Sequence, residues 1–198
     1  MLKRLFDVLV SLLGLAVLSP LFVIAIIVIK LDSKGPVFYR GQRVGRFGKL
    51  FKIYKFRTMI ADAERVGGSS TPEDDPRVTR CGRLLRKGKL DELPQIINIL
   101  QGDMSFVGPR PQVLWATRLY TQQQKALLDV RPGITDYASI KFHNEDEILR
   151  GSSDPDKDYL EKIAPEKIRL GLKYVGTHSL GTDVRVIFET FKILLKRK

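Results

Sequence analysis

Cysteine and histidine, the residues that most often build zinc and redox sites, are nearly absent from this chain. Its 198 residues include one cysteine, Cys81, and two histidines, His143 and His178. A single cysteine excludes an intrachain disulfide and a cysteine-based zinc site. The histidines stand far apart, and neither has a second histidine or a cysteine at a metal-ligand spacing. We therefore interpret all three as ordinary core or surface residues.

The chain also lacks the signatures of a nucleic-acid-binding protein, although it is strongly basic. It contains 34 Lys and Arg against 22 Asp and Glu, which gives a formal net charge of +12. Such an excess favours anionic partners, such as nucleic acid, anionic lipid or phosphorylated substrates. No helix-turn-helix, zinc finger or aromatic RNA-binding motif is visible. We expect no nucleic-acid partner, since a basic excess beside a membrane segment is also explained by topology.

Charge is missing altogether from Val8 to Ile29. A straight helix over this run would reach roughly 33 Å, which is enough to cross a bilayer. A soluble domain of this size needs no such run in its core. A cleaved signal peptide is disfavoured, because the apolar stretch is too long and no small-x-small cleavage site precedes a polar start. The run predicts a helix embedded in a membrane.

Ser19 and Pro20 interrupt this run near its middle. Proline removes a backbone donor and its ring clashes with the preceding turn, while serine can satisfy a freed backbone group inside a membrane. Each half would then cover roughly 15 Å, about half the hydrocarbon thickness. Basic residues on both flanks draw both ends to the cytoplasm. These features favour a re-entrant hairpin over residues 1–34, and a kinked spanning helix stays open.

Strand and helix patterns alternate along residues 35–198, which predicts one α+β domain that is mostly helical. Strands are expected over 37–39, 50–56 and 134–140, and helices over 60–66, part of 77–87, 93–100, 112–129 (with Gln122–Gln124 facing solvent) and 155–175. The last segment, 183–198, is amphipathic, with Asp183 as its expected N-cap. Such a helix can lie in a membrane interface or pack on the core, and its periodicity favours neither.

The densest group of charged residues surrounds Asp91 and Glu92, where an apolar helix begins. Free amides and the helix dipole stabilise an anion there, so capping is one role for Asp91. Phosphoryl transfer is another, because a carboxylate that attacks phosphorus forms an acyl phosphate and Mg²⁺ prefers oxygen ligands. Such chemistry needs cations to offset the phosphate charge. The candidate cations are Lys55, Arg57, Arg86 and Arg110.

Arg110 stands between Pro109 and Pro111, which restrict the backbone and could hold its guanidinium in place. Arginine binds phosphate through a planar fork of donors. The alternative interpretation is a rigid turn that carries a surface arginine.

Five segments together resemble the bacterial sugar transferase family, the monotopic polyprenyl-phosphate phosphoglycosyl transferases. They occur in the family's order and cover the chain nearly end to end, and the length is similar to that of minimal members with the catalytic unit alone. The segments are Ser19-Pro20, Lys55–Met59, Leu90–Gln95, Gly102–Pro111 and Arg131–Thr135.

The resemblance implies a location and a mechanism. It implies a monotopic protein of the cytoplasmic (inner) membrane, with a re-entrant helix, interfacial amphipathic helices and a cytoplasmic catalytic domain over residues 35–198. Asp91 would attack the β-phosphate of a UDP-sugar and release UMP, and the phosphosugar on Asp91 would pass to a polyprenyl phosphate such as undecaprenyl phosphate. This is a first membrane step of glycoconjugate or polysaccharide assembly.

The resemblance also implies roles for single residues. Mg²⁺ would bind at Asp91, and Glu92 would assist beside it. Asp183 matches a family aspartate, but no role follows for it. The substrate- and phosphate-binding residues would be Lys55, Arg57, Arg86, Pro109 and Arg110.

One segment departs from the family pattern. Many relatives continue after the Arg131–Thr135 motif with Gly-Trp-Ala-Gln-Val-Asn-Gly, whereas residues 136–142 of this chain read Asp-Tyr-Ala-Ser-Ile-Lys-Phe. The identity of the sugar and the glycan pathway therefore stay open, as does a homodimeric state. Two other functions also stay open: a membrane phosphatase that uses water as acceptor, and a non-catalytic protein that binds nucleic acid or anionic lipid through its positive charge.

Overall fold

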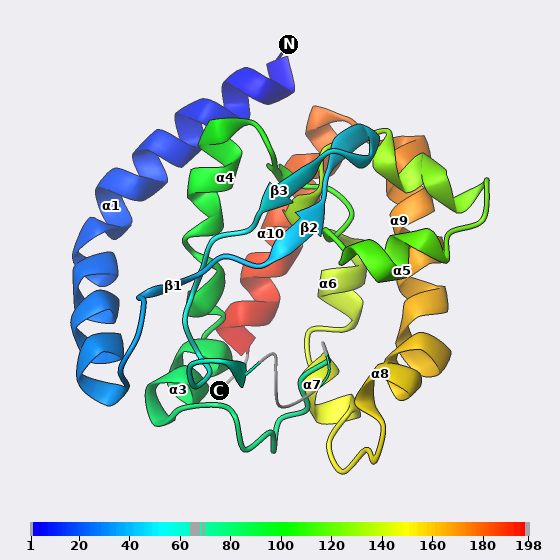
Figure 1. Ribbon diagram of the computed structural model, residues 1–198. Coiled ribbons are helices and arrows are strands. Elements are labelled where there is room, and N and C mark those ends of the chain that lie inside the picture. The colour runs from blue at the N-terminus through cyan, green and yellow to red at the C-terminus, as the bar shows by residue number, and fades with distance from the viewer. Residues whose placement is uncertain (1, 64–67, 69, 197–198) are drawn as a thin grey trace.

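The computed structural model describes residues 2–63, 68 and 70–196, and its fold is mostly helical with few strands (Figure 1). The α-helices are α1 (Leu2–Asp32), α3 (Arg80–Lys87), α4 (Gln95–Gln101), α5 (Leu114–Arg118), α6 (Tyr137–Lys141), α7 (Glu145–Ile148), α8 (Pro155–Asp158), α9 (Ala164–Thr177) and α10 (Leu180–Lys196). Short 3₁₀ or π segments are η1 (Arg46–Gly48), η2 (Leu90–Glu92), η3 (Gln124–Leu128) and η4 (Tyr159–Ile163). The strands are β1 (Phe38–Tyr39), β2 (Gln42–Val44), β3 (Leu50–Lys52), β4 (Lys55–Phe56), β5 (Ser105–Val107) and β6 (Gly133–Thr135).

The strands pair two by two. β1 pairs with β4 and β2 with β3, both antiparallel, while β5 and β6 run parallel. The long α1 flanks α4 along one side of the molecule, and α9 lies on the opposite side (Figure 1). The mostly helical α+β prediction is therefore confirmed.

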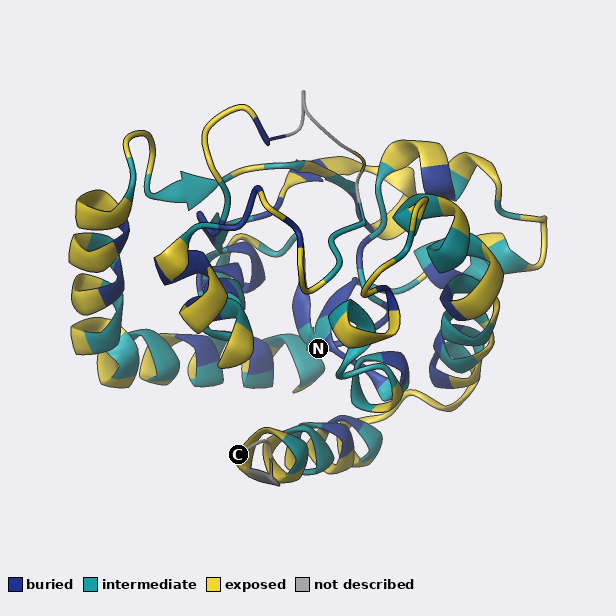
Figure 2. Cartoon of the chain, turned by 90° about the horizontal axis from the view of Figure 1, so that it is seen from below, coloured by how far each residue is buried: buried dark blue, intermediate teal, exposed yellow. Residues whose placement is uncertain are grey.

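α1 is one helix by its hydrogen bonding, but it bends near its middle, so that its two halves run in different directions (Figure 2). Pro20 lies inside the helix and lacks the amide hydrogen that would bond the Ala16 carbonyl. The Ser19 hydroxyl donates a 2.8 Å hydrogen bond to that carbonyl instead. Serine thus satisfies the group that proline frees, as predicted, and proline accounts for the bend.

The outward face of α1 is apolar and is not covered by protein. The helix is long and apolar enough to cross a membrane, and little of its apolar stretch is buried within the molecule. Leu13, Val17 and Leu31 are 67%, 66% and 82% exposed. The core helix of a soluble protein would bury such side chains, so this surface suits a membrane environment.

A buried polar network ties the first turn of α1 to the last two helices. Lys3 forms an ion pair with Asp183 and also donates to the Tyr174 hydroxyl at 3.3 Å. That hydroxyl donates to the other Asp183 oxygen at 2.7 Å. The prediction that Asp183 is an N-cap is wrong, because its carboxylate points inward to these partners. The Ser179 hydroxyl accepts from the Thr182 amide at 3.1 Å and caps α10 instead.

Arg57 holds the other end of α1. Its guanidinium donates to the Ser33 carbonyl at 2.6 Å and the Ser33 hydroxyl at 2.9 Å, and also to the carbonyls of Ile29 and Pro36. Ser33 and Pro36 follow the last residue of α1, so Arg57 fixes the segment by which the chain leaves this helix. Next to it, Ile29 packs against the buried ring of Phe56 from β4.

Several predicted elements have the right position, and two have the wrong extent. Helices α3 and α4 confirm the predictions over 77–87 and 93–100, and the consecutive α8, η4 and α9 confirm helical structure over 155–175. The predicted strand 50–56 is instead two strands, β3 and β4, that pair with different partners. The predicted helix 112–129 is broken into α5 and η3.

The predicted strand 134–140 is mostly wrong. β6 ends at Thr135, because Asp136 accepts a 2.7 Å hydrogen bond from the Ser139 amide and so caps a new helix, α6. The predicted helix 60–66 lies partly outside the described residues.

Candidate active site

Asp91 and Glu92 lie in the short turn η2, between α3 and α4. Lys89, just before this turn, has a left-handed backbone conformation with φ of 53°, which is uncommon for a residue other than glycine. Pro94 is the N-cap of α4, and no side chain caps that helix. The capping role considered for Asp91 is therefore wrong, and η2 holds its carboxylate in a buried position, 7% exposed.

Glu92 is clamped between two cations from distant parts of the chain. Lys55, on β4, donates to its Oε1 at 2.8 Å, and Arg110 donates to both carboxylate oxygens, to Oε2 at 3.1 Å. Burial alone would raise the Glu92 pKa, but Arg110 and Lys55 outweigh it and hold the pKa well below its usual range. Glu92 is therefore an anion at neutral pH, and the two cations are held in fixed positions.

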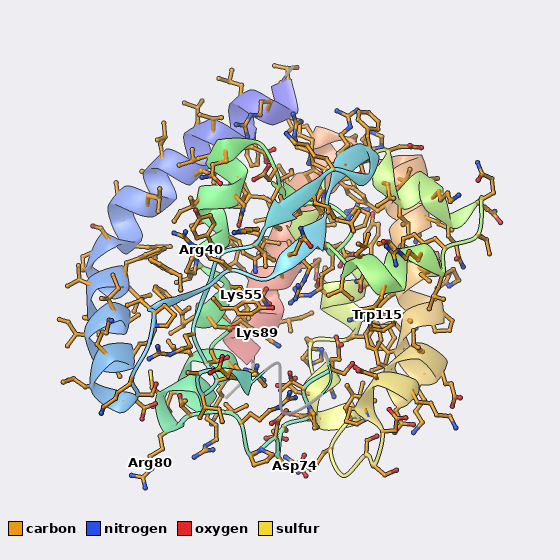
Figure 3. The ribbon with its side chains drawn as sticks, viewed as in Figure 1. Arg40, Lys55, Asp74, Arg80, Lys89 and Trp115 are labelled. Carbon is orange, nitrogen blue, oxygen red and sulfur yellow. The ribbon has the colours of Figure 1, made fainter. Side chains whose placement is uncertain are left out.

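Asp91 differs from its neighbour, since no described residue forms a hydrogen bond with its carboxylate. Burial raises the Asp91 pKa above the usual value, and the positive charge of Lys55 opposes that rise. Lys55 and Lys89 both lie near the middle of the face in Figure 3. Both, with Arg86, act on the Asp91 carboxylate by charge. Asp91 is thus a carboxylate under positive potential whose oxygens are available to a ligand.

Arg86 lies on the last turn of α3, and its Nε donates to the Thr58 hydroxyl at 3.0 Å. Burial lowers its pKa, and the charge of Asp91 opposes that effect. Arg57, the neighbour of Thr58, is oriented differently. Its hydrogen bonds go to the end of α1 and the residues that follow it, and none goes to Asp91 or Glu92. The structure thus gathers Lys55, Arg86 and Arg110 around the acidic pair, and phosphate binding by Arg57 stays a prediction.

Close backbone contact between β5 and β6 positions Arg110. The Gly108 amide donates to the Thr135 carbonyl and the Gly133 amide to the Pro109 carbonyl, both at 3.1 Å. A Cβ on Gly133 would lie 2.1 Å from the Gly108 nitrogen, so glycine is required there. Pro109 is buried beside this contact. The arginine is therefore fixed in place by the backbone on its N-terminal side.

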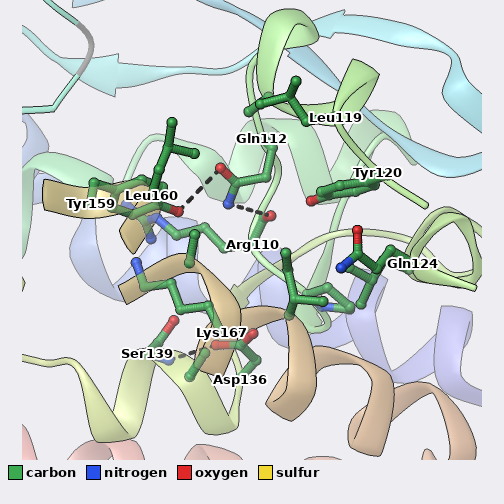
Figure 4. Close-up of a pocket in the computed structure, with 16 residues that line it drawn as sticks. Arg110, Gln112, Leu119, Tyr120, Gln124, Asp136, Ser139, Tyr159, Leu160 and Lys167 are labelled. Atoms are coloured by element: carbon green, nitrogen blue, oxygen red, sulfur yellow. Dashed lines mark hydrogen bonds between the residues drawn. The ribbon is translucent and has the colours of Figure 1, made fainter. Parts of the chain in front are cut away.

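A cavity adjoins Arg110 (Figure 4). Its walls come from segments far apart in the chain, so no local sequence pattern predicts it. The prediction that Gln124 faces solvent is wrong, because this side chain lines the cavity. Asp136, the first residue of the segment that departs from the family pattern, lines it as well. The polar side chains in its walls include Gln112, Tyr120, Gln124, Asp136, Tyr159 and Lys167.

A metal at this site would have few protein ligands. No group of three or more His, Cys, Asp or Glu side chains suited to a metal occurs among the described residues. Both Glu92 oxygens already accept from cations, which leaves Asp91. Mg²⁺ is often held by one or two carboxylates together with substrate phosphates. The residues present therefore fit Mg²⁺ in that mode.

A model of the family described as bacterial sugar transferase matches residues 1–197. The chain belongs to the bacterial sugar transferase family. This sugar transferase is 38% identical over 203 residues to the exopolysaccharide production protein ExoY of Sinorhizobium fredii, across 95% of this chain and 83% of the relative. It is 40% identical over 199 residues to the exopolysaccharide production protein PSS of Rhizobium leguminosarum bv. phaseoli, across 96% of this chain and 92% of the relative.

A third relative has a more specific name. The sugar transferase is 37% identical over 194 residues to the UDP-glucose:undecaprenyl-phosphate glucose-1-phosphate transferase of Escherichia coli. The match covers 96% of this chain but 39% of that longer protein.

Proposed function

We propose that this protein transfers a sugar 1-phosphate from a UDP-sugar to a polyprenyl phosphate, such as undecaprenyl phosphate, and releases UMP. The observation that carries the proposal is the contrast within η2. Glu92 is saturated by Lys55 and Arg110, while the adjacent Asp91 has no hydrogen-bond partner among the described residues. A nucleophilic carboxylate needs a free oxygen, and the phosphate that it attacks needs fixed cations nearby.

The chemistry takes two displacements at one phosphorus atom. An Asp91 oxygen attacks the β-phosphorus, and the bond from that phosphorus to the bridging oxygen breaks, so that UMP leaves with the electron pair. The polyprenyl phosphate oxygen then attacks the same phosphorus, and Asp91 leaves as a carboxylate. Arg110, Lys55 and Arg86 offset the negative charge that gathers on the transferring group.

Asp91 would also hold Mg²⁺, together with oxygens of the donor diphosphate. The ion would offset negative charge on that diphosphate. Because Glu92 holds Arg110 and Lys55 in place, these cations need little rearrangement during the reaction.

We also propose that the enzyme is monotopic, with residues 1–34 re-entrant in the cytoplasmic membrane and the catalytic domain, 35–198, on the cytoplasmic side. The bend of α1 and the basic residues on both its flanks support this topology. α10 would lie in the interface, since Phe188 and Leu195 are 60% and 79% exposed. This arrangement would let a soluble nucleotide sugar and a lipid phosphate reach the same carboxylate.

The test is transfer of label from a UDP-sugar into lipid. The purified full chain is incubated with Mg²⁺, undecaprenyl phosphate and each of several UDP-sugars labelled in the sugar. We expect label in the organic phase and an equal amount of UMP with at least one donor. Release of free sugar phosphate alone would indicate a phosphatase and refute the transferase proposal, and no turnover with any donor would refute both.

A further inference from the structure

We propose that the cavity beside Arg110 binds the sugar ring of the donor and selects which sugar is transferred. The inference rests on the proposed function and adds the residues that would determine its specificity. These residues lie outside the group formed by Asp91, Glu92 and their cations.

The position of the cavity next to Arg110 suits the sugar of the donor. Arg110 bonds Glu92 and also lines the cavity, so one guanidinium borders both spaces. The charge of Arg110 acts on the buried Asp136 in the wall as well as on Asp91. In the proposed reaction the sugar is bonded to the phosphate that Asp91 attacks, so it must lie next to Asp91 and its cations. The cavity provides a space for the sugar directly beside Arg110.

The charged side chains in the cavity wall suit an uncharged ligand better than a phosphate. Lys167, the lysine in the wall, already has an anionic partner in Glu145. Asp136 adds a buried carboxylate, 2% exposed. A diphosphate would be repelled by that carboxylate, whereas a neutral hydroxyl can donate to it and accept from Lys167. The wall therefore suits an uncharged ligand with many hydroxyl groups.

Polar groups in the cavity wall keep hydrogen-bonding capacity that no described residue uses. The Tyr120 hydroxyl has no partner among the described residues and points into the cavity in Figure 4. Gln124 accepts from the Thr121 amide at 2.9 Å through Oε1, while its amide nitrogen donates to no described residue. Tyr159 bonds Gln112 only weakly, at 3.4 Å. Apolar side chains such as Leu119 and Leu160 also line the cavity and can pack on the C–H faces of a sugar.

The experiment compares donors that differ at one position of the sugar. For the full chain, kcat/KM of UMP release is measured with UDP-glucose, UDP-galactose and UDP-N-acetylglucosamine in the presence of undecaprenyl phosphate. The variants are Gln124→Ala and Tyr120→Phe, and the matched control is Gln123→Ala, which removes a neighbouring glutamine outside the cavity wall. Inhibition by UMP is measured for each protein, because UMP contains the uridine of the donor but not the sugar that is transferred.

We expect each cavity variant to change the ratio of kcat/KM between two donors by about tenfold, as losing one hydrogen bond to a sugar hydroxyl would. The inhibition constant of UMP should stay unchanged, and Gln123→Ala should behave as the wild type. Equal losses with all donors, together with weaker UMP inhibition, would assign the cavity to the nucleoside and overturn the proposal.

Unchanged ratios in both variants would overturn it too, while leaving the transferase proposal intact. If the wild type released UMP from no UDP-sugar, the proposed function would fail first and the sugar site with it.

Discussion

Two buried carboxylate sites of this molecule, built from similar residues, differ in one respect. Under the first turn of α1, Asp183 has a partner for each oxygen, Lys3 and the Tyr174 hydroxyl. In η2, Glu92 is equally well paired, but Asp91 beside it has no hydrogen-bond partner among the described residues. A buried charge is stable when it is paired and costs free energy when it is not. The Asp183 site has the features of a structural link, whereas the η2 site has those of a ligand-binding site.

The sharpest test of this comparison applies the same substitution, Asp→Asn, at both sites. Asp91→Asn should lower kcat of UMP release by at least about 10³-fold, because the amide is not a nucleophile. Its thermal unfolding temperature in detergent should be unchanged or higher, since no described hydrogen bond is lost and a buried charge is removed. Substantial Mg²⁺-dependent UMP release from this variant would refute the nucleophile assignment.

Asp183→Asn should lower the stability of the protein and leave its kcat nearly unchanged. The substitution leaves the Lys3 ammonium without an anionic partner, and Lys3 is partly exposed, so we expect a loss of about 1–3 kcal/mol in the free energy of unfolding. The unfolding temperature should fall by several degrees, while kcat of the folded enzyme stays within about twofold of wild type.

The double variant Lys3→Met/Asp183→Asn is the control, because it removes both charges. It should recover part of the lost stability. A kcat loss at Asp183→Asn as large as that at Asp91→Asn would contradict the division into a structural and a reactive site.

The smallest expected effect is a shift in the pH dependence. Asp91 reacts as the anion, and burial raises its pKa. Activity should therefore be lost as the pH falls through a value above the ordinary aspartate pKa of about 3.9. Glu92 should add no step there, because Arg110 and Lys55 hold its pKa well below the usual range. The measurement is kcat/KM between about pH 4 and pH 8, and a flat profile down to pH 4 would show that the Asp91 pKa is not raised.

Local pattern predicted much of the fold. The features that predicted α1 and α4 involve residues close together in the sequence. They are the uncharged run with its Ser19-Pro20 interruption and the apolar periodicity over 93–100. Both segments are helical as expected. Predictions failed where a distant contact or a cap decided the outcome. The expected strand over 134–140 ends at Thr135, and most of the rest is helix α6, which the Asp136 side chain caps. Asp183 was misassigned because its partner, Lys3, lies at the other end of the chain.

The sequence by itself determined the family, the membrane helix and the identity of the acidic pair, since these depend on composition, order and short spacing. Only the tertiary structure decided which member of the pair is hydrogen-bonded. The folding of β4 and the β5–β6 contact place Lys55 and Arg110 so that they form hydrogen bonds with Glu92, while on Asp91 they act by charge. The tertiary structure also turned Arg57 toward the end of α1 and brought Gln124, Asp136 and Lys167 around one cavity. Hydrogen bonds and burial depend on distances in space, which a one-dimensional pattern does not contain.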